Sequence, residues 1–302
     1  MNLQRFKTLL LREWMQHRLG WLLVMFVPPL LVMLLLPFGQ VAPGDDLRPD
    51  FPTHGANFLA FGTLCATAVA MFGITWAINT FQLPGLARRD QQDRSIEFWM
   101  SLPSTHAESI GATLLMHALL VPMAALAAGS AVGLLMAAGL LTKLLNIGAI
   151  VQVDWALVLG MAAVALARFL IGIVLMSLWL APLLLALMAA SAWLKRLGVP
   201  VLVAATLIGG NLLKHFYETS IVFDLLTAQL NGASFALLRL DSASGAPEPE
   251  HLMDHGVAGF AQFMLENLGQ ALSQLASAQF IGGLLVAAAC FWLLMLRRGR
   301  NA

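Results

Sequence analysis

Long runs of apolar residues alternate with short polar segments along the chain, and this pattern predicts an all-α protein that spans a membrane. A helix rises about 1.5 Å per residue, so about 20 apolar residues cross the roughly 30 Å of hydrocarbon in a bilayer. We predict a single transmembrane domain over residues 1–302 with six spans, at about residues 20–38, 57–81, 110–141, 169–193, 197–213 and 271–296.

Three further segments carry helical patterns. Residues 3–18 mix basic side chains with regularly spaced apolar ones, as in an amphipathic helix that lies at the membrane surface. Residues 218–270 are too long for a plain turn and too apolar for a linker, so we expect a small external segment of short helices. Residues 129–133 hold two glycines four residues apart, which we interpret as a packing surface for another helix rather than as a dimer interface.

One ionisable residue interrupts the fourth apolar run. The run from Trp155 to Trp193 is too long for one perpendicular crossing, and Arg168 lies within it. An ionised Arg at mid-membrane costs about 2.5–3.5 kcal/mol on insertion scales. We therefore expect Arg168 at the outer interface with its side chain reaching the headgroups, rather than facing a transport pathway. Residues 155–167 would then extend the span beyond the bilayer or lie along its surface.

Composition agrees with a membrane protein and excludes a soluble globular domain. Of the 302 residues, 59% are hydrophobic and only 11% are charged. The only cysteines, Cys65 and Cys290, lie inside apolar runs, so we expect no disulfide framework.

The basic residues are distributed unevenly between the predicted loops. Twelve Lys and Arg lie at the termini, in residues 88–105 and just after the fourth span, whereas the opposite loops hold four. By the positive-inside rule, both termini and residues 88–105 are cytoplasmic, and residues 39–56, 142–154 and 218–270 are external.

The most charged segment of the first half of the chain is the loop of residues 88–105. Arranged as a short helix, Ile96, Trp99 and Met100 form one apolar face while Arg94 lies on the polar side. Such a helix lies beside a membrane or contacts a partner.

The end of this loop has the sequence pattern of a helix break followed by a new helix start. Pro103 breaks the short helix, and Thr105 with Glu108 three residues later forms a capping-box pattern that starts the next helix. We therefore predict that Thr105 and Glu108 fix the loop to the third span.

Motif searches find no catalytic or metal centre. The chain has no Gly-x-x-x-x-Gly-Lys-Ser/Thr loop, so it does not bind nucleotide in that way, and no protease, hydrolase or Cys-x-x-Cys motif. His251, Asp254 and His255 could offer metal ligands, but we interpret them as solvated loop residues.

A polar row follows the second predicted span, formed by Thr63, Thr67, Thr75 and Asn79. Two interpretations stay open and are about equally favoured. The row could line a path for an amphipathic substrate, or its hydroxyls could bond to carbonyls of their own helix and to neighbouring helices.

Three sequence segments resemble type-2 ABC exporter permeases. The sharpest is residues 94–108, Arg-Ser-Ile-Glu-Phe-Trp-Met-Ser-Leu-Pro-Ser-Thr-His-Ala-Glu, which is similar to the first cytoplasmic loop of that family. Arg12-Glu13-Trp14 resembles the Arg-Glu-aromatic of the family's elbow helix, and Ser191-Ala192-Trp193 with Lys195-Arg196 also resembles the family.

The resemblance implies an N-terminal elbow helix at residues 3–18 and a cytoplasmic coupling helix that docks on a separate ATPase dimer. The residues that would form or brace this contact are Arg94, Ser95, Glu97, Phe98, Trp99, Ser101, Leu102 and Pro103. ATP and Mg would be bound by the ATPase partner, and no cofactor by this chain. A second copy or a related permease would complete the complex in the plasma (bacterial inner) membrane.

We therefore expect the membrane permease subunit of an ATP-driven ABC exporter, which is not itself an enzyme. One alternative is an ABC complex that pulls on a membrane or external partner. Another is a stand-alone secondary carrier, against which stand the scarcity of intramembrane charge and the lack of an evident inverted repeat. Nothing in the sequence indicates a nucleic-acid partner.

Overall fold

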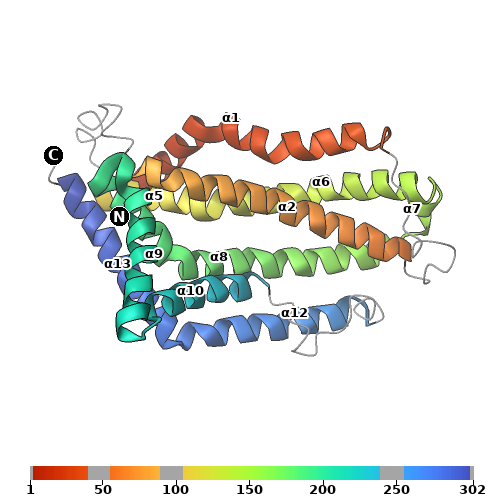
Figure 1. Cartoon of the computed structure of the whole chain (residues 1–302). Helices are drawn as coiled ribbons and strands as arrows, with labels where there is room; N and C mark the ends of the chain where they lie inside the picture. The colour runs from red at the N-terminus through yellow and green to blue at the C-terminus, as the bar shows by residue number, and fades with distance from the viewer. Residues whose placement is uncertain (1–2, 40–54, 89–104, 239–254, 300–302) are drawn as a thin grey trace.

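The computed structural model describes residues 3–39, 55–88, 105–238 and 255–299. These ranges are almost entirely helical and contain no strand, as predicted from the apolar periodicity (Figure 1). The elements in chain order are α1 (Leu3–Leu35), α2 (Gly55–Leu86), α5 (His106–Leu114), η2 (Leu115–Leu120), α6 (Val121–Leu144), α7 (Ala149–Gln152), α8 (Trp155–Leu194), η3 (Lys195–Leu197), α9 (Gly198–Tyr217), α10 (Ile221–Leu237), α12 (Gly256–Ser273), η5 (Gln274–Ala276) and α13 (Ala278–Gly299).

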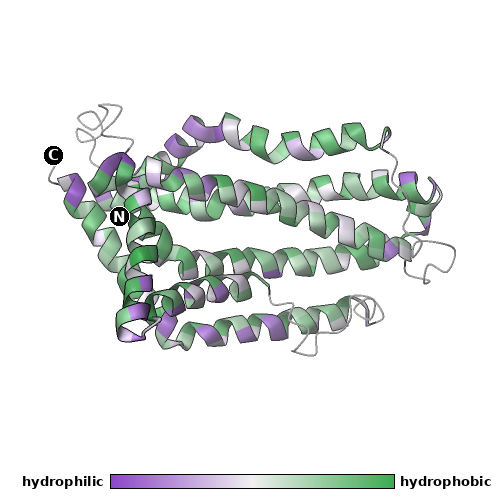
Figure 2. Ribbon diagram, viewed as in Figure 1, coloured by the Kyte–Doolittle hydropathy of each residue, from purple (hydrophilic) through white to green (hydrophobic). Residues whose placement is uncertain are grey.

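Within the described ranges, five helical stretches are long and apolar enough to cross a membrane. They are Leu3–Leu35, Gly55–Leu86, His106–Leu144, Trp155–Tyr217 and Ala278–Gly299. The fourth stretch contains both α8 and α9, which cover the ranges predicted for the fourth and fifth spans. Figure 2 shows that most residues along these helices are apolar, as expected for helices that cross a membrane.

The N-terminal amphipathic segment and the first span form one continuous helix, α1. Residues 3–18 are therefore not a separate helix, although the first turns run obliquely to the rest (Figure 1). Pro28 and Pro29 both lie inside α1. The beginning of α1 lies at the same end of the bundle as the last residues of α2 and α13, and we call this the terminal end (Figure 1).

The third predicted span is also one helical run, but its hydrogen-bonding pattern changes within it. Helix α5 passes into the π-helical turn η2 and then into α6. A π turn is uncommon within an α-helix and often occurs at functional sites. His117, the buried histidine inside η2, is therefore a candidate functional residue.

Helices α2 and α6 pack with their backbones in close contact. A Cβ atom added to Gly129 would lie 2.7 Å from Ala68 Cα, and one added to Gly133 would lie 2.8 Å from the Leu64 carbonyl oxygen. Only glycine permits this approach. The small residues at 129–133 are therefore used for packing within the chain, as predicted.

Helix α8 is the central element of the second half of the chain. Trp179 of α8 contacts Phe280 of α13, with ring centroids 5.0 Å apart, and Trp193 donates a hydrogen bond to the Leu293 carbonyl oxygen at 3.4 Å. These pairs show that α13 runs in the same direction as α8. Gly198, at the start of α9, packs closely against Ala190 of α8.

The described parts of residues 218–270 are helical, as predicted, and their external position stays a prediction. These parts are the antiparallel helices α10 and α12, which lie along α8 rather than beyond its end (Figure 1). Gly232 of α10 packs on Trp179, and Phe260 of α12 packs near Met161. Both helices bury small and apolar residues against α8. The removal of this apolar surface from water stabilises their position along α8.

Candidate functional site

The predicted ATPase-coupling residues, from Arg94 to Pro103, lie outside the described residues. The two helices that flank them are described. Helix α2 ends at Leu86 and α5 begins at His106, both at the terminal end (Figure 1). Any force on residues 89–104 would therefore reach α2 and α5 first.

The start of α5 has the predicted capping box. Glu108 donates its backbone N–H to Thr105 Oγ1 at 3.2 Å, and Thr105 donates its backbone N–H to Glu108 Oε2 at 3.1 Å. These bonds satisfy two donors at the first turn of the helix. Residue 105 is thus held in a fixed direction relative to α5.

The polar row on α2 does not form one continuous surface. Thr67 donates its hydroxyl to the Thr63 carbonyl oxygen at 2.8 Å, which is a bond within its own helix. Thr75 and Asn79 are each only 1% exposed. The path-lining role therefore stays a prediction, whereas Asn79 has a clear packing role.

Asn79 joins α2 to two other helices. Its Oδ1 accepts a hydrogen bond from Trp21 Nε1 of α1 at 2.9 Å, and its Nδ2 donates to the His117 carbonyl oxygen in η2 at 3.1 Å. A buried amide in an apolar environment needs such partners, because an unpaired one costs about 1–3 kcal/mol. Asn79 therefore holds α1, α2 and η2 in one arrangement.

Glu13 provides a second link between α1 and the third helical run. Its side chain is completely buried, and Oε1 accepts hydrogen bonds from Arg12 Nη2 at 2.6 Å and from Thr113 Oγ1 of α5 at 3.1 Å. A buried carboxylate is stable only when it is paired and hydrogen-bonded. Arg12 supplies the opposite charge, and Thr113 ties that ion pair to α5.

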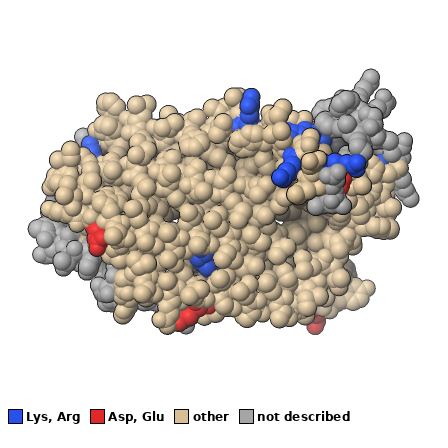
Figure 3. All heavy atoms as spheres, turned by 180° about the vertical axis from the view of Figure 1, so that it is seen from behind, with Lys and Arg blue, Asp and Glu red and all other residues tan. Residues whose placement is uncertain are grey.

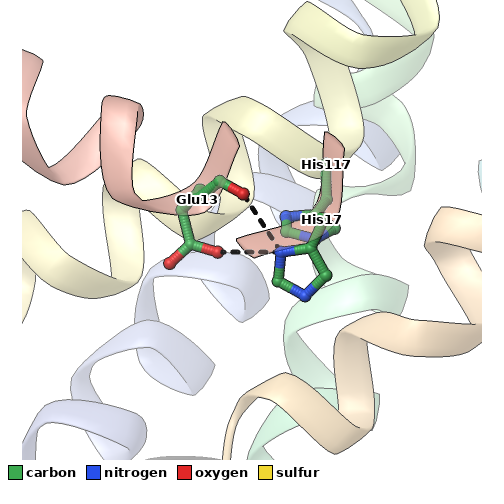
Figure 4. A group of neighbouring side chains, drawn as sticks. All are labelled: Glu13, His17 and His117. Atoms are coloured by element: carbon green, nitrogen blue, oxygen red, sulfur yellow. Dashed lines mark hydrogen bonds and ion pairs between the residues drawn. The ribbon is translucent and has the colours of Figure 1, made fainter. Parts of the chain in front are cut away.

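Two histidines complete this polar cluster (Figure 4). His17 lies one turn after Glu13, with Nδ1 3.9 Å from Glu13 Oε2. His117 lies edge-on to His17, with ring centroids 5.0 Å apart. The residues that join α1, α2, α5 and η2 are Glu13, His17, Trp21, Asn79, Thr113 and His117, and we call them the polar cluster.

Backbone contacts orient both imidazoles of the polar cluster. His17 Nδ1 is 3.1 Å from the Glu13 carbonyl oxygen, and His117 Nδ1 is 3.0 Å from the Thr113 carbonyl oxygen. A carbonyl can only accept, so a hydrogen bond there assigns the proton to Nδ1 and, in the neutral ring, leaves Nε2 as the acceptor nitrogen. One donor atom from each of Glu13, His17 and His117 lies within 4.8 Å of the others, a spacing that could hold a metal ion.

In comparisons with known proteins, no family model, no curated protein and no solved structure matched the chain. The polar cluster is therefore interpreted from its own geometry.

Most of the polar cluster was not predicted from the sequence. Glu13 was placed only in an amphipathic surface helix, and the metal candidates were His251, Asp254 and His255. Of these three, only His255 is in the described part of the chain, where it is exposed. The signal that could have found the cluster is the pair Glu13 and His17, four residues apart on one face of α1.

Arg168 corrects another prediction, because its side chain does not reach the headgroups. It is 3% exposed and points into the protein. Its Nε and Nη2 donate to Asn267 Oδ1 of α12 at 3.1 and 2.7 Å, and Nη1 donates to the Ala236 carbonyl oxygen of α10 at 3.0 Å. Burial against α10 and α12 supplies polar partners that lipid could not. Residues 155–167 form the first turns of α8, and their position relative to the bilayer stays a prediction.

Replacing Asn267 by leucine should destabilise the protein by about 1.5–3 kcal/mol, the usual contribution of hydrogen bonds to a charged group. The double variant Arg168→Leu/Asn267→Leu should be more stable than Asn267→Leu alone, because it removes the buried charge as well. SDS-titrated unfolding followed by tryptophan fluorescence measures both. Asn211→Leu, at an exposed position of α9, is the matched control. Equal midpoints for Asn267→Leu and Asn211→Leu would contradict this role for Asn267.

Proposed function

We propose that this chain is the membrane permease subunit of an ATP-driven exporter of the type-2 ABC class. It has six spans, with α8 and α9 as the fourth and fifth, and both termini in the cytoplasm. The resemblance of residues 94–108 to the cytoplasmic loop of such permeases supports this proposal. So does the distribution of charge, since Lys and Arg gather near the terminal end on the face shown in Figure 3.

The observation that carries the proposal is the clamping of three helices at the terminal end. Glu13 joins α1 to α5 through Thr113, and Asn79 joins α2 to α1 and to η2. The segment of residues 89–104 is inserted between two of these clamped helices. A push on that segment therefore moves α1, α2 and the third helical run together.

Close backbone packing extends the clamp along the bundle. Gly129 and Gly133, about one helical turn apart on α6, both contact α2, so the two helices behave as a rigid pair. When two ATPase subunits close on ATP, residues 94–104 move, and the α2–α6 pair tilts as a body. This tilt switches a central path, formed with a second permease, between inward and outward access.

The ATP, the Mg²⁺ and the hydrolysis belong to the partner ATPase. Coupling then depends on contacts between the ATPase surface and the aromatic and charged side chains of residues 94–103. Aromatic side chains in such contacts supply much of the binding energy, while charges set the orientation.

Affinity purification of the chain in mild detergent, followed by mass spectrometry, should recover an ATPase with a nucleotide-binding loop. Glu97→Arg combined with Trp99→Ala should lower this recovery at least about tenfold, because a single interface hot spot contributes about 2 kcal/mol or more. Asp46→Arg combined with Phe51→Ala is the matched control, since it makes the same changes in a loop predicted to be external.

Two results would contradict the proposal. One is the recovery of no ATPase with the unmutated chain at normal expression. The other is equal recovery with the coupling variant and the control variant.

A further inference from the structure

We propose that Glu13, His17 and His117 form a binding site for a divalent transition-metal ion of the zinc class, which fastens α1 to η2. This inference does not rest on the proposed transport function, because it concerns the contacts of this chain alone. One carboxylate and two imidazoles are a ligand set that zinc uses, with water or another ligand in the fourth position.

The spacing of the three residues suits a metal ion. Their donor atoms lie within 4.8 Å of one another. Zinc bonds to nitrogen and oxygen ligands at about 2.0–2.2 Å, which sets ligand atoms about 3–3.5 Å apart around a tetrahedral ion. Side-chain rotations that bring the donors about 1.5 Å closer would therefore complete the site.

The backbone behind His117 already has the arrangement typical of metal centres. Metal-binding histidines commonly donate their second ring N–H to a backbone carbonyl, which fixes the ring and the tautomer. His117 has this arrangement, because its Nδ1 lies 3.0 Å from the Thr113 carbonyl oxygen and Nε2 is the nitrogen left for an ion. Glu13 has Oε1 held by Arg12 and Thr113. Its Oε2 lies 3.9 Å from His17 Nδ1, so His17 would bind the ion through Nδ1 in place of its contact with the Glu13 carbonyl oxygen.

The charges around the site select the class of metal. Arg12 Nη2 lies 2.6 Å from Glu13 Oε1, and this positive charge opposes any cation. Mg²⁺ and Ca²⁺ take oxygen ligands and would depend on that one carboxylate. Zinc-class ions gain much of their binding from imidazole nitrogen, and the site has two imidazoles.

The π turn contributes to this geometry. His117 lies inside η2, and its carbonyl oxygen is bonded by Asn79. The turn therefore presents the His117 ring towards α1 while its backbone is held from the side of α2. A metal ion would join two elements about 100 residues apart in sequence and hold α1 against the third helical run.

The site has a route for the ion. The side chains of Glu13 and His117 are fully buried, whereas that of His17 is 22% exposed. An ion would enter beside His17, the one partly exposed ligand of the three. Because the ligands must be deprotonated, binding should weaken as the pH falls.

The test uses the full chain in detergent, with the affinity tag removed and metals stripped by a chelator. Equilibrium dialysis against Zn²⁺ should give about one bound ion per chain, and Co²⁺ should give the visible absorption of a tetrahedral site. His117→Gln, His17→Gln and Glu13→Gln should each lower the Zn²⁺ affinity at least about tenfold, as losses around metal ligands commonly do. His215→Gln, at an exposed position of α9, should leave it unchanged.

A second measurement separates metal binding from a purely structural role. Zn²⁺ should raise the unfolding midpoint of the unmutated chain and of His215→Gln, but not that of His17→Gln. His17 is only partly buried, so its variant keeps the test valid if His117→Gln does not fold. Two results would overturn the proposal. One is that the unmutated chain binds no Zn²⁺, and the other is that His17→Gln and His215→Gln bind Zn²⁺ equally well. Neither result bears on ATPase recovery, so the two proposals can fail separately.

Discussion

Replacing Gly133 by alanine is expected to separate α2 from α6 and to destabilise the protein by about 1–3 kcal/mol, the usual cost of adding volume to a packed interface. The added Cβ would lie 2.8 Å from the Leu64 carbonyl oxygen and 2.9 Å from Leu64 Cα. Both are backbone atoms, so no side-chain rotation relieves the contact and the helices themselves must move. SDS-titrated unfolding followed by tryptophan fluorescence measures the loss.

The matched controls are Gly111→Ala in α5 and Gly73→Ala in α2. An added Cβ at either position meets no atom within 4 Å. Alanine should therefore leave stability unchanged or raise it by up to about 1 kcal/mol, since glycine is the poorer helix former. If Gly133→Ala were as stable as these controls, the α2–α6 contact would not have the proposed role.

The same variant distinguishes packing within the chain from a dimer interface. If the glycine row joined two copies, Gly133→Ala would change the oligomeric state, as measured by size-exclusion chromatography with light scattering. We expect the stability to fall while the oligomeric state is unchanged.

Features that depend on local sequence were predicted well. The second span was predicted at residues 57–81 and α2 occupies Gly55–Leu86, while the third was predicted at 110–141 and the helical run occupies His106–Leu144. Hydropathy and capping act over a few residues, so the pattern of the chain records them directly.

Two contacts between residues far apart in the sequence were missed. Arg168 and Asn267 are 99 residues apart, and Glu13 and Thr113 are 100 apart. A single sequence shows that such residues are costly to bury in lipid, but it does not show which helix supplies their partners. The prediction for Arg168 failed for this reason, because a surface position was favoured over a pathway-facing one without a known neighbour.

The polar cluster has one part that local sequence predicts and another part that only the tertiary packing shows. The Arg12-Glu13-Trp14 segment was recognised from its residue types, whereas its burial against α5 follows only from the fold. A charged segment that seemed suited to the membrane surface is instead the point where α1 is fixed to the bundle. This arrangement makes Glu13 the residue whose loss should have the largest effect.

Replacing Glu13 by alanine should destabilise the protein by about 3–5 kcal/mol, because it leaves the Arg12 guanidinium without its carboxylate in a largely buried position. It also removes the bond from Thr113 to α1. Glu13→Gln keeps an oxygen that can accept from Thr113 and should cost less. Hydrogen–deuterium exchange should show faster exchange in α1 near residue 13, with α8 little changed.

Thr113→Val and the exposed Glu266→Ala provide the comparison. Glu266 lies at an exposed position of α12, where it accepts a hydrogen bond from Gln262 one turn earlier, so its removal should change stability by less than about 0.5 kcal/mol. In a double-mutant cycle, Glu13→Ala and Thr113→Val should be non-additive, since each removes the same bond between α1 and α5. Additive effects would mean that α1 is held at the terminal end mainly by Trp21 and Asn79. A rigid link through Glu13 would then no longer explain how a push on residues 89–104 reaches α1.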